Sequence, residues 1–133
     1  MIKVINGIAF LIFMLLLNIS CKKGGCNTVL DSVSFRTTLS PEQTSQVRVA
    51  NGWSYADGGN CGLIVYNTGE KIIAYDRCSS ASSSKLIVEG FQVVDQEIGA
   101  KWLLLDGSPS YLSECSLRAY RVQSVGSFIV VEN

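Results

Sequence analysis

The side chains best suited to chemistry in this 133-residue sequence are its five cysteines, and the sequence contains no histidine. Without an imidazole, the chain lacks the usual general base near neutral pH and the commonest metal ligand. Catalytic triads that depend on histidine, His-rich zinc sites and haem sites with a proximal histidine are therefore excluded. The chemistry that remains is that of thiols, disulfides and carboxylates.

Charge and residue spacing disfavour two further classes of function. The 11 basic residues are balanced by 11 acidic ones, so no positive surplus can neutralise phosphates, and no nucleic-acid partner is expected. A serine hydrolase without histidine would need a Ser–Lys pair, and the spacing Ser82 to Lys85 lies in a predicted loop. We therefore expect no enzymatic activity. We interpret Trp53, Tyr55 and Tyr111 as strand-packing residues rather than as a stacking site for a sugar or peptide.

Cys21 stands at the end of a segment that has the layout of an export signal. Lys3 gives a positive start, ten apolar residues run from Ile8 to Leu17, and Ser20 precedes the cysteine. This segment resembles the signal of bacterial lipoproteins, in which a small residue precedes the cysteine that is acylated. The resemblance implies removal of residues 1–20, attachment of acyl chains such as palmitate to Cys21, and anchoring to the outer or inner membrane of the cell envelope.

A retained membrane anchor, or plain secretion, is the alternative for this segment. The apolar run is ten residues long, whereas a helix that spans a bilayer needs roughly 20. Residues 21–28, which follow, are polar and glycine-rich and predict a short tether. Residues 29–133 then form one domain of ordinary size.

Alternating and apolar runs in this domain predict short strands and no long helix. The apolar run Gly62–Tyr66 and the returning segment 71–75 predict a hairpin whose first strand is buried. Ser40-Pro41 predicts a single helical turn, and Asn51-Gly52 predicts a hairpin turn between 47–49 and 53–55. Other strands are expected at 33–39, 86–89, 91–94, 101–105, 117–122 and 128–131. The domain is therefore predicted to be an all-β sandwich or small barrel.

Three stretches of the domain carry a family resemblance. The segments GLIVYNTGEKIIAYDRC (62–78), LLLDGSPSY (103–111) and SLRAYRV (116–122) resemble, in order, the Rieske-type iron–sulfur fold, and the Rieske-like lipoproteins of Bacteroidetes most closely. In that family a hairpin ending in Ala-Tyr/Phe-Asp leads into the first loop that binds the cluster. A second loop reads Cys-x-x-His-Gly-Ser-x-Tyr/Phe, and a Leu-x-x-Tyr-x-Val strand follows it.

The resemblance implies two vestigial cluster loops. Cys78 takes the place of the first loop's cysteine, and Ser80 stands where its histidine would be. The second loop's cysteine falls near Leu103 and its histidine at Asp106. The residues after it are Gly107, Ser108 and Tyr111, which resembles the loop's aromatic residue. A [2Fe–2S] cluster of this class is held by two cysteines and two histidines, so this cofactor is not expected here, and Asp106-Gly107-Ser108 is interpreted as a turn.

Four cysteines besides Cys21 remain to be assigned. Their even number in an exported domain predicts two disulfides, with three possible connectivities. The resemblance brings the two loops close to the segment before the last strand, which implies a Cys78–Cys115 bridge and leaves Cys61 for Cys26. Four free thiols, or a metal site made from them, are the alternatives.

The sequence therefore predicts a membrane-anchored envelope lipoprotein whose Rieske-like domain has lost its cluster ligands. Its expected role is that of a binding or accessory module, with an unknown envelope protein or small ligand as partner. The first alternative is a redox or metal-binding protein that still uses a [2Fe–2S] or cysteine site. The second is a hydrolase that uses Ser108 or another serine.

Overall fold

The computed structural model describes residues 33–82 and 84–133 of the chain. The predictions for the signal segment, for lipidation of Cys21, for the tether and for Cys26 lie outside these residues. Within the described ranges, no helix is long and apolar enough to cross a membrane.

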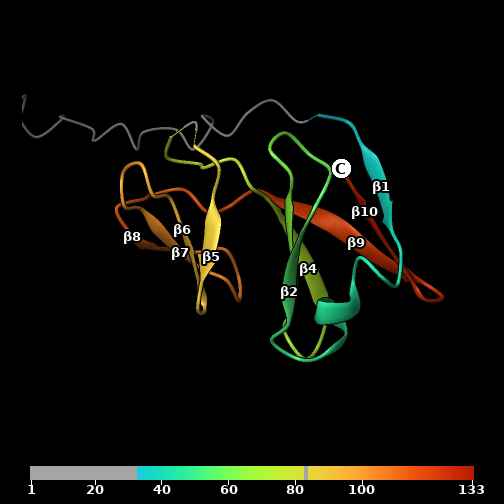
Figure 1. Ribbon diagram of the computed structural model, residues 1–133. Coiled ribbons are helices and arrows are strands. Elements are labelled where there is room, and N and C mark those ends of the chain that lie inside the picture. Colours follow the sequence, from blue (N-terminus) through green and yellow to red (C-terminus); the bar gives the residue numbers. More distant parts are fainter. Residues whose placement is uncertain (1–32, 83) are drawn as a thin grey trace, which may run out of the picture.

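The described residues form two antiparallel sheets (Figure 1). The larger sheet has the strand order β1-β10-β9-β4-β3-β2, and the smaller has the order β5-β6-β7-β8. The larger sheet contains β1 (Arg36–Leu39), β2 (Trp53–Ala56), β3 (Leu63–Asn67), β4 (Ile72–Asp76), β9 (Ala119–Val125) and β10 (Phe128–Glu132). The smaller contains β5 (Ile87–Glu89), β6 (Gln92–Val94), β7 (Lys101–Leu103) and β8 (Pro109–Tyr111). The all-β prediction is confirmed.

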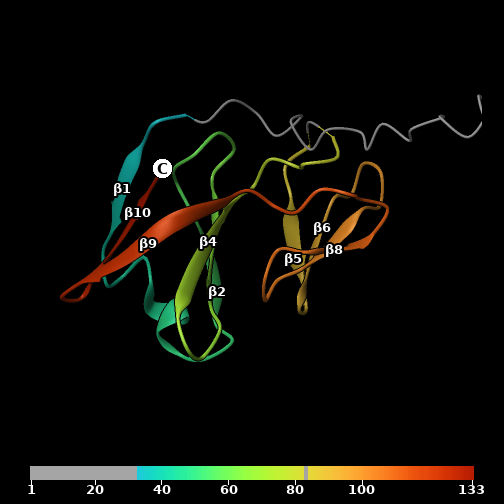
Figure 2. The same cartoon turned by 180° about the vertical axis from the view of Figure 1, so that it is seen from behind.

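The smaller sheet lies in the chain between β4 and β9, which pair with each other in the larger sheet. The views from the front and from behind both show the small sheet beside the large one, joined to it by the chain that leaves β4 and by the chain that enters β9 (Figures 1 and 2). Both connections therefore run along the same seam between the sheets.

Strand β3 is buried on both faces, which explains its unbroken apolar run. Leu63 and Val65 pack into the core of the larger sheet, whereas Ile64 and Tyr66 point into a second core. Successive side chains of a strand point to opposite faces, so a strand covered on both sides needs apolar residues at every position. The predicted hairpin of β3 and β4 is confirmed by the pairing of these two strands.

The second core lies between the two sheets and belongs to both. Trp102, fully buried on β7, packs with Ile64 and Tyr66 of β3 and with Tyr75 of β4. The polar atoms of its aromatic residues are satisfied: Trp102 Nε1 donates to the carbonyl of Cys115 (2.8 Å), and the Tyr75 hydroxyl donates to the carbonyl of Leu104 (3.1 Å). The seam between the sheets is therefore a packed interface.

The predicted hairpin around Asn51-Gly52 is wrong. Val47 lies in a 3-10 helix, η2 (Ser45–Arg48), and its side chain is fully buried. Asn51 has φ 65°, so a turn is present, but it leads from η2 into β2. The side-chain amide of Asn67 donates through Nδ2 to the carbonyl of Val47 (2.9 Å), and this contact with β3 holds the helical turn in place. Strand β8 was not predicted, because its residues Pro109–Tyr111 fall in the segment interpreted as a turn and a vestigial cluster loop.

Candidate functional site: the two facing loops

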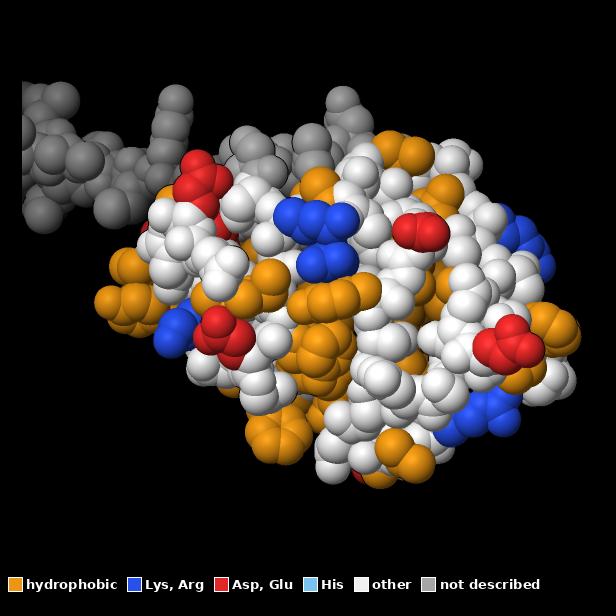
Figure 3. All heavy atoms as spheres, in the orientation of Figure 1, with side chains coloured by type: hydrophobic (Ala, Val, Ile, Leu, Met, Phe, Trp, Pro, Cys, Tyr) orange, Lys and Arg blue, Asp and Glu red, His pale blue; other side chains and the backbone are white. Residues whose placement is uncertain are grey.

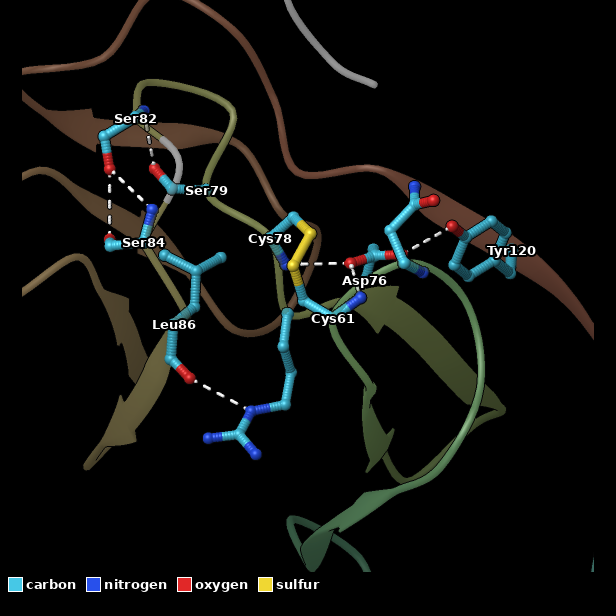
Figure 4. Close-up of a disulfide and its surroundings, with 10 residues drawn as sticks. Cys61, Asp76, Cys78, Ser79, Ser82, Ser84, Leu86 and Tyr120 are labelled. Carbon is cyan, nitrogen blue, oxygen red and sulfur yellow. Dashed lines mark hydrogen bonds between the residues drawn. A yellow bond between two sulfur atoms is a disulfide. The ribbon is translucent and has the colours of Figure 1, made fainter. Parts of the chain in front are cut away.

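The first loop follows β4 and is closed at its base like a hairpin. Cys78 forms an antiparallel bridge with Lys85, and the amide of Ser79 donates to the carbonyl of Ser84 (2.9 Å). Between these residues the chain is rich in serine, and Ser79, Ser82 and Ser84 turn their hydroxyls the same way. The close-up shows these three side chains beside the disulfide and the Asp76 network (Figure 4).

All three hydroxyls donate to the carboxylate of Asp95, each at 2.6 Å. Asp95 follows β6 directly, is fully buried, and also accepts the backbone N–H of Glu97 (2.9 Å). Burial by itself would raise the pKa of Asp95, but the hydrogen bonds from the three serines and from Glu97 outweigh it and lower this pKa to about 2. Asp95 is therefore an ionised, fully bonded carboxylate that joins the first loop to a second one.

The second loop spans residues 95–100 and connects β6 to β7. It is closed at its base because the amide of Asp95 donates to the carbonyl of Ala100 (2.9 Å). Gly99, with φ 77°, donates to the carbonyl of Asp95 (2.8 Å), a backbone conformation that glycine adopts without strain. This loop and the serine-rich loop face each other across the Asp95 carboxylate.

The segment that faces the first loop therefore differs from the one that the resemblance implies. Residues 95–102 read Asp-Gln-Glu-Ile-Gly-Ala-Lys-Trp, which has the spacing of the family pattern Cys-x-x-His-Gly-Ser-x-Tyr/Phe. In this register Asp95 stands at the cysteine position, Ile98 at the histidine position, and Trp102 at the aromatic position. The resemblance places the second loop at the Gly-Ser pair 107–108, whereas the segment that faces the serine-rich loop has a glycine followed three residues later by an aromatic residue.

The residues first assigned to the second loop lie elsewhere. Leu103 ends β7 and is partly exposed, and Tyr111 is an exposed residue of the edge strand β8. Asp106 accepts the backbone N–H of Ser108 (2.9 Å) and its hydroxyl (2.6 Å), so the turn interpretation of these residues is correct. Gly107 is buried, and a Cβ there would meet the Tyr75 ring at 2.8 Å, which explains why a glycine occupies this turn.

Ser80 and Cys115 lie against each other, but the cysteine pairing differs from the prediction. The Ser80 hydroxyl donates to the carbonyl of Cys115 (3.1 Å). Cys78, however, is bonded to Cys61, with 5.1 Å between their Cα atoms. The predicted Cys78–Cys115 and Cys26–Cys61 bridges are therefore wrong. Cys115 is disulfide-bonded as well.

The Cys61–Cys78 bridge is explained by the pairing of β3 and β4. Cys61 closes the turn that enters β3, and Cys78 follows the end of β4. Because Leu63 lies opposite Asp76 in the register of the two strands, the two cysteines flank the same end of the hairpin. Spatial proximity of this kind follows from the hairpin that the sequence predicts, and this local signal could have identified the pair.

Asp76 organises the backbone around the disulfide and is almost fully buried. Its Oδ2 accepts the amide of Asn60 (2.6 Å) and the hydroxyl of Tyr120 (2.7 Å), and its Oδ1 accepts the amides of Cys61 (3.2 Å) and Cys78 (2.8 Å). Figure 4 shows the carboxylate between the disulfide and the Tyr120 ring. Burial and the nearby Asp76 carboxylate raise the pKa of Tyr120, so its hydroxyl remains a donor.

The donor atoms of Cys61, Asp76 and Cys78 lie within 4.8 Å of one another, a spacing that could suit a metal ion. Metals bind cysteine as the thiolate, whereas these two sulfurs are joined in a disulfide. Both carboxylate oxygens of Asp76 already accept two hydrogen bonds each. In the oxidised protein, this grouping is a structural junction.

A two-iron centre of the kind implied by the resemblance does not fit these loops. It needs two thiolates on one iron and two imidazoles on the other, and the chain has no histidine. Cys78, the cysteine that the resemblance places at a ligand position, has its sulfur bonded to Cys61. At the second loop's cysteine position, Asp95 accepts hydroxyls of the first loop instead.

Comparison with known proteins agrees with this architecture. No protein-family model and no curated protein matches the chain. The solved ferredoxin of carbazole 1,9a-dioxygenase from Nocardioides aromaticivorans IC177 is 17% identical with a TM-score of 0.50, and the match covers 77% of this chain and 98% of that one. A complex of reduced oxygenase and oxidized ferredoxin in carbazole 1,9a-dioxygenase gives 18% identity and a TM-score of 0.47, covering 77% and 94%. At such identity the likeness concerns the fold alone, and the expected Rieske-like fold is confirmed.

Proposed function

We propose that this protein is a lipid-anchored module of the bacterial cell envelope that binds a partner through a Rieske-like domain without an iron–sulfur cluster. The observation that carries the proposal is the Asp95 carboxylate, which accepts three serine hydroxyls of the facing loop. In the register given by the pattern Cys-x-x-His-Gly-Ser-x-Tyr/Phe, this carboxylate occupies a cluster-ligand position. On this proposal, hydrogen bonds hold the two loops together where proteins of this fold family would hold a cluster.

A carboxylate can replace a cluster between the two loops only if hydrogen-bond donors are supplied at the same time. Loss of a cluster alone would leave two loops of polar backbone facing each other without a bridge. A buried ionised carboxylate is costly unless it is fully hydrogen-bonded, and here the serine-rich loop supplies the donors, as the low pKa of Asp95 reflects. The three serines and Asp95 therefore form one hydrogen-bonding unit. Removing the carboxylate would leave the hydroxyls without an acceptor, and removing the serines would leave the buried carboxylate without donors.

The anchor and the location rest on the sequence. A short apolar segment followed by Ser20-Cys21 supports acylation of Cys21, which would fix the domain stably to a membrane surface when more than one acyl chain is attached. Because the chain contains no imidazole and the pair Ser82 and Lys85 does not lie in a helix, we assign the domain a non-catalytic role. Its partner is an envelope protein or a small ligand.

The proposal is tested on protein purified from bacterial membranes after expression with its own signal segment, under anaerobic conditions and with iron supplied. We expect a colourless, iron-free protein by visible absorption and metal analysis. Its intact mass should equal that of the polypeptide from residue 21 plus acyl chains. Stoichiometric iron with the absorption of a two-iron centre contradicts the cluster-free role, and an unmodified Cys21 contradicts the anchor.

A second candidate, a thiol-based metal protein, is favoured by one observation, the grouping of Cys61, Asp76 and Cys78. It requires that the disulfide be opened in the envelope. Zinc binding to the chemically reduced protein, lost in the double variant Cys61→Ser with Cys78→Ser, would support it. The cluster-free module is favoured instead if free thiols are alkylated in intact cells and the Cys61–Cys78 bridge is then recovered quantitatively.

A further inference from the structure

We propose that the groove beside the Cys61–Cys78 bridge binds a carboxylate, which Arg77 and Lys85 recognise. The inference rests on the proposed binding role and names a site for it. The groove encloses about 730 Å³. It lies where the turn that enters β3 meets the start of the serine-rich loop. The lining residues used below are Tyr55, Asp57, Cys61, Gly62, Arg77 and Lys85.

Arg77 is held in one orientation on the wall of the groove. Its Nε donates to the carbonyl of Leu86 (3.1 Å), and its guanidinium lies 3.6 Å from the centre of the Tyr55 ring. Tyr55 is fixed in turn, since its hydroxyl accepts the backbone N–H of Val88 (2.9 Å) and its ring packs at 4.9 Å from that of Trp53. The guanidinium is therefore positioned before any ligand arrives.

Most N–H groups of the Arg77 guanidinium make no hydrogen bond to the described residues. A guanidinium carries five N–H groups, and among the described residues only its Nε makes a hydrogen bond. The ion pair that the structure forms within residues 33–82 and 84–133, Arg36 with Glu132, lies at the paired ends of β1 and β10. A fixed guanidinium that faces a groove, and that pairs with no acidic side chain of the described residues, is suited to bind a carboxylate through two parallel hydrogen bonds.

Lys85 adds a second positive charge, and Asp57 is the acidic side chain among the lining residues. Lys85 is held close to the disulfide by its bridge with Cys78, although its side chain is exposed. The lining thus carries two cations against one anion. Figure 3 shows Lys or Arg side chains directly above a band of hydrophobic side chains on this face, between β5 and β2 of Figure 1.

The walls of the groove are rigid, which favours recognition of a defined group. The Cys61–Cys78 bridge crosses one wall, and the amide of Arg77 donates to the carbonyl of Gly62 (2.8 Å) at the same point. A receptor whose donors are already fixed loses little conformational entropy on binding. The ligand chemistry is therefore an anionic, planar carboxylate, supplied by a small dicarboxylic acid or by a Glu or Asp side chain of a partner peptide.

Isothermal titration calorimetry of the lipidated full-length protein in non-ionic detergent tests this site. The probes are glutarate and a tetraglutamate peptide, with tetraglutamine and inorganic phosphate as controls. Both peptides are N-acetylated and C-amidated, so that only glutamate side chains carry carboxylates. Binding of glutarate identifies a free acid as sufficient, and binding of the peptide alone identifies an acidic segment. Absence of binding by both carboxylates, or equal binding of tetraglutamine or of phosphate, overturns the proposal.

Four single variants locate the site, and each changes the charge by one. Arg77→Gln should weaken binding by about tenfold or more, because the bidentate contact is lost. Lys85→Gln should weaken binding by about two- to fivefold. Asp57→Asn should strengthen binding by a similar factor, because the Asp57 carboxylate no longer repels the carboxylate of the ligand. Lys71→Gln, on the exposed turn between β3 and β4, is the matched control and should leave the affinity unchanged.

The outcomes separate this site from the proposed function. Lys85 and Asp57 are exposed, so their variants should fold even if Arg77→Gln does not. If wild-type protein binds a carboxylate but all four variants bind it equally, the site is wrong. The cluster-free envelope role stands or falls on iron content and acylation, which none of these substitutions touches.

Discussion

Replacing Asp95 with asparagine tests the hydrogen bonds that join the two loops. The Oδ2 atom of Asp95 accepts both Ser79 and Ser82, and Oδ1 accepts Ser84. In the variant, an amide nitrogen at the Oδ2 position cannot accept these hydrogen bonds, because its own N–H groups would face the hydroxyl donors of Ser79 and Ser82. The Ser79 hydroxyl cannot simply reverse, because its oxygen already accepts the backbone N–H of Ala81 and of Ser82, both at 3.1 Å.

The expected loss of stability is about 3 kcal/mol. Hydrogen bonds to a charged group contribute about 1.5–3 kcal/mol each, and two of them are lost; relaxation of the serines recovers part of the total. The pH dependence gives a second value. Lowering the pKa of Asp95 from 3.8 to about 2 corresponds to about 2 kcal/mol of folding free energy at neutral pH. Because this pKa is lower in the folded protein, the contribution is present above pH 4 and is lost as the pH falls towards 2.

Urea unfolding followed by tryptophan fluorescence at pH 7 and at pH 2.5 measures both effects. The Asp95→Asn variant should be less stable than wild type at pH 7, and the difference should shrink at pH 2.5. Asp106→Asn is the matched control, because Asp106 accepts serine groups in an exposed turn, where the cost should stay below about 1 kcal/mol. Equal stability of Asp95→Asn and wild type at pH 7, or a difference that does not change with pH, would refute the reasoning.

Three other changes should be measurable by the same unfolding assay. Cys61→Ser combined with Cys78→Ser opens a bridge between residues separated by 17 positions and should cost about 3 kcal/mol; unreduced peptide mapping should recover this bridge in wild type, and its absence there would contradict the assignment. Tyr120→Phe removes a buried 2.7 Å hydrogen bond to a carboxylate and should cost about 1–3 kcal/mol. Since the pKa of Tyr120 is raised in the folded protein, its contribution is present below pH 10 and is lost above it, and the variant should lack this alkaline loss. Trp102→Phe leaves a cavity and removes the indole hydrogen bond to the Cys115 carbonyl, which still accepts the Ser80 hydroxyl. It should cost about 2–4 kcal/mol, and a smaller cost than that of Tyr120→Phe would show that the core between the sheets is loosely packed.

The fold could be predicted from local patterns where the composition of a segment follows directly from the burial of one strand. The run from Gly62 to Tyr66 has apolar residues on both faces, and the structure buries both faces of β3. The error at Val47 arose because alternation of apolar residues over a few positions does not separate a strand from a short 3-10 turn. Burial of Val47 against β3 decides that case, and such a contact is not visible in the sequence.

The candidate site was only partly predictable. Cys78, Ser80 and the serine-rich loop could be located, because the hairpin before them is a strong signal. The partner across the gap could not be located: Asp95 is a single acidic residue in a polar segment, and its importance comes from three hydroxyls that reach it from residues 79–84. The resemblance implies a bridge from Cys78 to Cys115, whereas the register of the β3–β4 hairpin places Cys78 beside Cys61.

The core between the two sheets limits how the molecule can move. Ile64 and Tyr66 on β3, together with Tyr75 on β4, supply one side of the apolar contacts around Trp102. The smaller sheet is therefore not an independent folding unit, and a fragment that contains it alone would expose its apolar side chains to water. Any rotation of one sheet against the other would separate these side chains and expose them to water. A hinge motion at the seam is therefore energetically unfavourable. A partner that docks on this protein meets a single rigid body, and its affinity depends on the surface it finds rather than on a rearrangement of the domain.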